Sequence, residues 1–132
     1  MIQMLIDWTR EFDKWWEKVE EQQNLDARSR QIAKIVGTQL DFLQELAQMP
    51  EENSMQIRRV ALSKKNLLWR ISHPYREGIA IRLVLWIPPY ERDLAVIVMG
   101  VDKSKMGDIF YDGVGNRADL LISEYLRDEG NG

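Results

Sequence analysis

Apolar and charged residues alternate at helical spacing over the first third of the chain. Four apolar side chains follow an i, i+3, i+4, i+7 pattern and are flanked by charged residues: Phe12, Trp15, Trp16 and Val19. Thr9 precedes this stripe and is a favourable N-cap. We therefore expect an amphipathic helix from about Arg10 to Gln22.

A second helical pattern follows a polar turn. Asp26 is placed to cap it, and its apolar stripe consists of Ile32, Val36, Leu40, Leu43 and Ala47. The helix should end before Pro50, because the residue preceding a proline disfavours helical backbone angles. The two helices are expected to form an antiparallel hairpin whose joint apolar face covers another layer.

The pattern changes to that of strands in the middle of the chain. Four apolar runs are separated by turn residues: Met55–Leu62, Leu67–Ser72, Ile79–Ile87 and Leu94–Val101. The last two are nearly continuous, as expected of central strands covered on both faces. The segment Ile2–Asp7 is a further short strand or the start of a helix.

The C-terminal part completes the expected architecture. Lys103–Gly115 is irregular or a short helix, and Asn116 can cap a final helix. The chain is thus predicted to be a single α+β domain spanning residues 1–132. Its N-terminal helical hairpin should pack on a twisted antiparallel sheet of about four strands, followed by a C-terminal helix.

Composition narrows the classes of protein and of site. The 132 residues suffice for one domain with a core, and the absence of cysteine excludes disulfides and thiolate metal sites. Met1 leads directly into an amphipathic pattern without the features of a signal peptide, and no apolar run approaches the roughly 18 residues of a membrane span. We expect a soluble, cytoplasmic protein that does not associate with membranes.

Charge is unevenly distributed along the chain. Residues 54–105 carry ten Lys and Arg against four Asp and Glu, whereas the segments on either side are acidic and the whole chain has a net charge of −3. The strand-rich middle is therefore basic. It either pairs with the acidic ends or binds an anionic partner.

Single cations interrupt the apolar strands. Arg70 lies within LLWRIS, Arg82 lies within IAIRLVLW, and Lys103 and Lys105 follow LAVIVMGV. An arginine in an apolar strand is costly to bury unless it is paired. A cationic surface for an anion such as phosphate is one explanation, and pairing of Arg82 with Asp102 or Glu77 is the other.

With this order of elements, the chain resembles the RelE/ParE superfamily, the toxin components of bacterial toxin–antitoxin systems. The resemblance extends from about Ile2 to Leu126 and rests on the motifs LWRIS, IAIRLVLW, LAVIVMGVDKSK and the tyrosine of DIFYDG. RelE-like members cut mRNA through the substrate 2′-hydroxyl, without a metal or cofactor, and thereby inhibit translation and arrest growth. Such enzymes need a base, cations for the transition-state charge and a proton donor.

The resemblance implies a role for each candidate residue. Arg70, Arg82 and Lys105 would stabilise phosphate charge, and Tyr111 and His73 are candidates for proton transfer or base stacking. Lys103 and Arg76 are expected to contact RNA.

The resemblance also implies partners and leaves alternatives. The expected partners are a cognate antitoxin and mRNA, with or without the ribosome. Ser72 stands where the ribonuclease branch has a second lysine, which together with the acidic ends favours a ParE-like inhibitor of DNA gyrase. A third hypothesis is a diverged, non-toxic binding module of the same fold.

Overall fold

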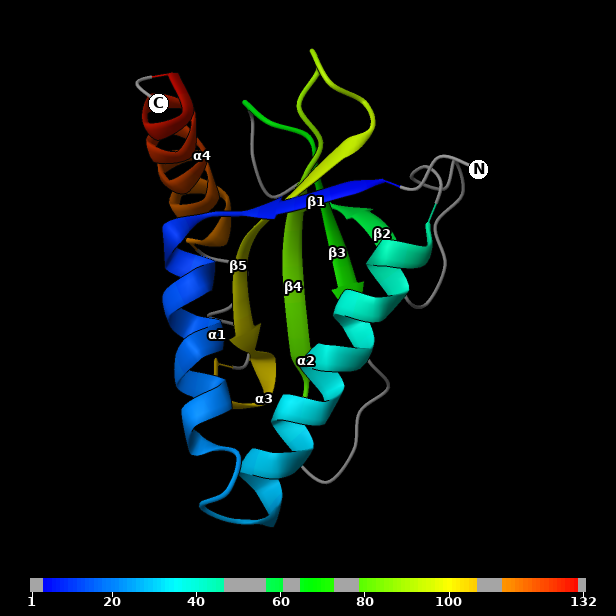
Figure 1. The fold of residues 1–132 in the computed structure, drawn as a ribbon. Helices are drawn as coiled ribbons and strands as arrows, with labels where there is room; N and C mark the ends of the chain where they lie inside the picture. Colours follow the sequence, from blue (N-terminus) through cyan, green and yellow to red (C-terminus); the bar gives the residue numbers. More distant parts are fainter. Residues whose placement is uncertain (1–3, 47–56, 61–64, 73–78, 107–112, 131–132) are drawn as a thin grey trace.

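The fold is described from a computed structural model that defines residues 4–46, 57–60, 65–72, 79–106 and 113–130. The described elements, in chain order, are β1 (Leu5–Trp8), α1 (Arg10–Gln22), α2 (Ala27–Glu45), β2 (Ile57–Val60), β3 (Leu68–Ser72), β4 (Ile81–Trp86), β5 (Leu94–Asp102), α3 (Lys103–Met106) and α4 (Val114–Gly130). The α+β class, with a helical hairpin before the sheet and a helix after it, is confirmed (Figure 1).

The strands form one five-stranded sheet in the order β1-β5-β4-β3-β2. Strands β2 to β5 are antiparallel neighbours, as predicted. The expectation of a purely antiparallel sheet of about four strands omitted one pairing, because β1 adds to the edge of β5 in parallel. A parallel pair needs a long crossover, and here most of the chain lies between the two partners.

The first two helices are capped by the polar residues that the sequence predicted. The Thr9 hydroxyl accepts a hydrogen bond from the N–H of Phe12 (3.1 Å) and donates one to the carbonyl of Val98 (2.6 Å). Asp26 accepts one from the N–H of Ser29 (2.7 Å), and this bond lowers the pKa of Asp26. Thr9 thus ties the start of α1 to β5.

The second helix ends before Pro50 as predicted, whereas the predicted start of the last helix is wrong by a few residues. Helix α2 ends at Glu45, and Leu46 after it adopts an extended backbone. Helix α4 begins at Val114, and the N–H of Arg117 donates to the carbonyl of Gly113. Asn116 therefore lies inside the first turn of α4 and does not cap it.

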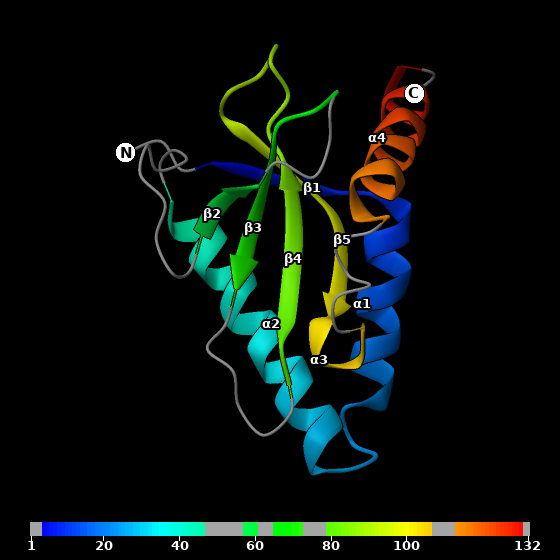
Figure 2. The same ribbon diagram turned by 180° about the vertical axis from the view of Figure 1, so that it is seen from behind.

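The two faces of the sheet have separate apolar cores. The hairpin α1–α2 covers one face with a cluster that includes Phe12, Ile35, Val36, Leu43, Ile71, Leu83, Leu85 and Ile97. Helix α4 packs on the other face, where its side chains join Val84, Trp86, Val96 and Val98. Figure 2 shows that α4 lies at the β5 side of the sheet, whereas no helix stands in front of β2 and β3 among the described elements.

Helix α1 packs tightly against β5 at Gly100. A Cβ atom at this position would lie 2.6 Å from Cζ3 of Trp15, which leaves room only for glycine. On the opposite side of the sheet, the Tyr125 hydroxyl of α4 donates a hydrogen bond to Asp7 of β1 (2.7 Å). Burial, followed by this bond and the charge of Asp7, raises the pKa of Tyr125 well above its ordinary value.

Candidate functional site

The register of β3 and β4 brings two predicted arginines onto one face. Arg82 is the cross-strand partner of Ser72, and Arg70 lies two residues before Ser72 on the same strand. Since alternate residues of a strand share a face, all three side chains belong to the face opposite the helical hairpin. Diagonal neighbours of this kind have Cβ atoms about 7–8 Å apart, so one anion can contact both guanidinium groups.

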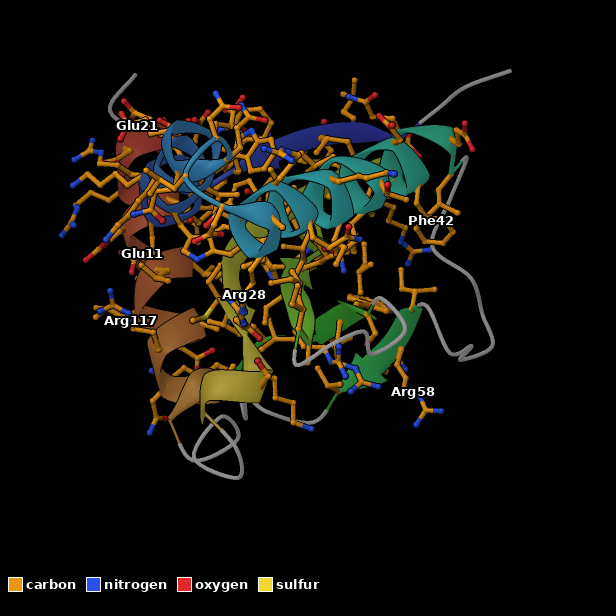
Figure 3. The ribbon with its side chains drawn as sticks, turned by 90° about the horizontal axis from the view of Figure 1, so that it is seen from below. Glu11, Glu21, Arg28, Phe42, Arg58 and Arg117 are labelled. Carbon is orange, nitrogen blue, oxygen red and sulfur yellow. The ribbon has the colours of Figure 1, made fainter. Side chains whose placement is uncertain are left out.

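A third arginine on this face was not singled out from the sequence. Arg58 of β2 is the direct cross-strand partner of Arg70, which places their Cβ atoms about 5 Å apart. Figure 3 shows the Arg58 side chain pointing away from α2. The alternation of IRRV contained this signal, because one of two consecutive arginines must join each face of a strand. We call Arg58, Arg70, Ser72 and Arg82 the arginine face.

Three like charges on neighbouring strands oppose folding. Like charges directly opposite in a sheet are destabilising. Among the described residues, neither Arg58 nor Arg70 forms an ion pair with an acidic side chain. An anion bound between them would remove this repulsion.

The exposure of the arginine face suits a bound oxyanion. Arg58 is exposed, while Arg70, Ser72 and Arg82 are half-buried. Within the described residues, the buried Nε of Arg70 and the buried Oγ of Ser72 have no hydrogen-bond partner. Buried polar groups are normally bonded, and unfilled ones commonly mark a place for an ion or water. The Arg82 guanidinium donates to the carbonyl of Ile81 (3.1 Å), which helps to fix its position.

The alternative pairing of Arg82 with Asp102 is not what the structure has. Asp102 is the register partner of Ile81, whose side chain faces the hairpin. The Asp102 carboxylate accepts a hydrogen bond from Arg28 of α2 at 2.6 Å. Burial alone would raise the pKa of Asp102, but hydrogen bonds from Ser104, Arg28 and the N–H of Ala80 outweigh it and lower that pKa. Figure 3 shows Arg28 on the hairpin side. Glu77, the other acidic candidate, lies outside the described residues.

The remaining predicted site residues are only partly placed. Lys103 is the first residue of α3, is half-buried, and lies at the same end of the sheet as Arg82 because Asp102 pairs with Ile81. Lys105 belongs to α3, but its side chain lies outside the described part of the chain. His73, Arg76 and Tyr111 also lie outside the described residues, so their predicted roles stay predictions.

Comparison of the chain with protein-family models, curated protein sequences and solved structures gives no match. The described residues contain no group of three or more His, Asp or Glu side chains placed to hold a metal ion. No helix in that part of the chain combines the length and apolar character needed to cross a membrane.

Proposed function

We propose that the chain is a RelE-like endoribonuclease that cuts mRNA and is held inactive by an antitoxin. The observation that supports this most strongly is the arginine face, where Arg58, Arg70 and Arg82 meet on three adjacent strands. Arginine is suited to phosphate because its planar fork of N–H groups binds two oxygens at once. A half-buried position strengthens such contacts by excluding part of the water.

The chemistry needs no group beyond side chains. A base takes the proton of the substrate 2′-hydroxyl, the 2′-oxygen attacks the adjacent phosphorus, and the bond to the 5′-oxygen breaks as that oxygen receives a proton. Products are a 2′,3′-cyclic phosphate and a 5′-hydroxyl. Arg70 and Arg82 would stabilise the extra negative charge on the phosphorane-like transition state. His73 and Tyr111 are the candidates for the proton transfers.

Ser72 gives this proposed site a different composition from the ribonuclease branch that the chain resembles. A serine hydroxyl can donate one hydrogen bond to a phosphate oxygen but carries no charge. In this proposal Arg58 compensates, since it brings a third cation next to Arg70 from the neighbouring strand. The basic middle of the chain would equally suit an acidic segment of an antitoxin.

A cleavage assay on a synthetic RNA tests the proposal. The purified chain, with and without ribosomes, should release cyclic-phosphate products, and 2′-O-methyl RNA should not be cut. Arg70→Ala and Arg82→Ala should lower the rate at least about 100-fold, as loss of one donor to transition-state charge does elsewhere. Arg30→Ala removes an exposed cation from α2 on the other side of the sheet and should cleave normally.

Expression in bacteria separates this function from the alternatives. Growth arrest with fragmented mRNA and a stop in protein synthesis supports the ribonuclease, and Arg82→Ala should then abolish the arrest. Arrest with intact mRNA and blocked DNA synthesis would instead indicate gyrase inhibition. Harmless expression, together with no cleavage in vitro, would refute a toxin altogether.

A further inference from the structure

A cavity lies at one end of the sheet, apart from the arginine face. It has a volume of about 760 Å³, within the range of small-molecule sites. Its lining comes from the segments next to the β2–β3 and β4–β5 connections, which lie side by side at this end in Figures 1 and 2. None of the four residues of the arginine face lines it.

Two tryptophans from opposite faces of the sheet contribute to this end cavity. Trp69 belongs to the hairpin face, where it packs at the border of that core. Trp86 belongs to the core beneath α4 and is buried. The cavity therefore continues around the ends of β3 and β4 rather than lying on one face. A chain-like ligand that runs along the arginine face can reach it without crossing the sheet.

The walls of the cavity combine flat apolar surface with positive charge. Trp69, Leu67 and Pro88 supply apolar surface. Among the described lining residues, Arg59, Lys65 and Arg92 are cations and Asp93 is the one acid. The guanidinium carbon of Arg59 lies 5.4 Å from the centre of the Trp69 ring. Aromatic rings next to cations are the usual means of holding single-stranded nucleic acid, because bases stack on the rings and phosphates contact the cations.

We propose that this end cavity binds a nucleotide of single-stranded RNA, with its base against Trp69 and its phosphate near Arg59 and Arg92. This inference rests on the proposed function, because it extends the same RNA beyond the cleavage site. Leu67 in the cavity wall precedes Arg70 by three residues and Ser72 by five, so the end of the sheet lies about 10–17 Å along β3 from these two residues at about 3.3 Å per residue. A few nucleotides span that distance at about 3.4 Å per stacked base.

The decisive experiment measures binding of RNA that cannot be cleaved. A fluorescein-labelled 2′-O-methyl RNA octamer is titrated with the wild-type chain, with Arg59→Ala/Arg92→Ala and with the matched control Arg30→Ala/Lys34→Ala, in fluorescence polarisation. All four residues are exposed, so both double variants should fold, which melting curves verify. The cavity variant should bind at least about tenfold more weakly, and the control should match the wild type.

Salt dependence and crosslinking give independent readouts. Removing two phosphate contacts should reduce the slope of log K against log salt by about 1.4, at about 0.7 per contact for single strands. With an octamer carrying 4-thiouridine, near-ultraviolet irradiation followed by peptide mass spectrometry should place the crosslink at Trp69. Equal octamer affinity of the cavity variant and the control, or a crosslink confined to peptides outside the cavity, would overturn the proposal.

The outcomes distinguish this inference from the proposed function. A dinucleotide substrate reaches only the arginine face, so its cleavage should be lost in Arg70→Ala and retained in the cavity variant. Cleavage with unchanged octamer affinity refutes the cavity alone, whereas cavity-dependent octamer binding without any cleavage refutes the ribonuclease alone. If the cavity variant instead loses only binding of a labelled oligoglutamate peptide, the cavity is a protein-docking site and the inference is wrong.

Discussion

Replacing Gly100 by alanine should destabilise the fold because of space alone. The backbone φ of Gly100 lies outside the positive range that favours glycine, so alanine is conformationally acceptable there. An added Cβ, however, would lie 2.6, 2.8 and 2.9 Å from three atoms of the Trp15 ring. The ring packs against the hairpin core, so the ring itself, α1 or β5 must shift to make room. Overpacking of this kind costs about 1–3 kcal/mol.

Urea denaturation followed by circular dichroism measures this cost. With an m-value of about 1–3 kcal/mol/M, the midpoint of unfolding of Gly100→Ala should fall by about 1 M. Gly37→Ala is the matched control, because no atom lies within 4 Å of a Cβ placed at Gly37 in the middle of α2. Alanine should there raise stability by about 0.5–1 kcal/mol through its better helix propensity.

A second substitution shows whether Trp15 causes the effect. In Trp15→Leu the smaller side chain leaves room for the new methyl group, so Gly100→Ala should cost much less in that background. The two substitutions should therefore be coupled by about 0.5–3 kcal/mol. If Gly100→Ala is as stable as the wild type, or if its cost is the same with leucine at position 15, the close contact between α1 and β5 is not as described.

Three further predictions concern charge and hydrogen bonding. Asp102→Asn should lose about 1–3 kcal/mol of stability at pH 7. Because the folded pKa of Asp102 is lowered, the difference in stability from the wild type should shrink as the pH falls below about 4. A difference that does not change with pH would contradict this. Tyr125→Phe should lose about 1–3 kcal/mol of stability with the bond to Asp7. Since the folded pKa of Tyr125 is raised, this contribution is fully present below about pH 10 and is lost as the pH rises through the folded pKa. In spectrophotometric titration the variant should lack one tyrosine that ionises late. Arg58→Glu should pair with Arg70 and gain about 0.2–1 kcal/mol in thermal unfolding while weakening RNA binding, and a loss of stability would contradict the cross-strand pairing.

Local signals in the sequence were sufficient for the helices and for most of the strands. The Thr9 cap and the stripe from Phe12 to Val19 define α1, whose observed bounds, Arg10–Gln22, are those predicted. The start of α4 was harder to predict, because Asn116 is a favourable cap by residue type but the helix begins two residues earlier, at Val114.

The sequence indicated two arginines of the candidate site, but it did not show that they lie on the same face. Arg70 and Arg82 stand out because each interrupts an apolar strand, but whether they share a face depends on the register between β3 and β4. Register also decides which of Arg58 and Arg59 joins them. Likewise, the partner of Asp102 is Arg28, 74 residues earlier in the chain, and periodicity carries no information about such a pair.

The parallel pairing of β1 with β5 has a consequence for the order of folding. Leu5 pairs with Leu94, so β1 cannot form its ladder until the chain has been synthesised as far as β5. Strands β2, β3 and β4 are joined in sequence by antiparallel pairing, which closes much shorter loops and is kinetically favoured. The three strands that carry the arginine face can therefore assemble first, and β1 adds last as the edge that completes the sheet.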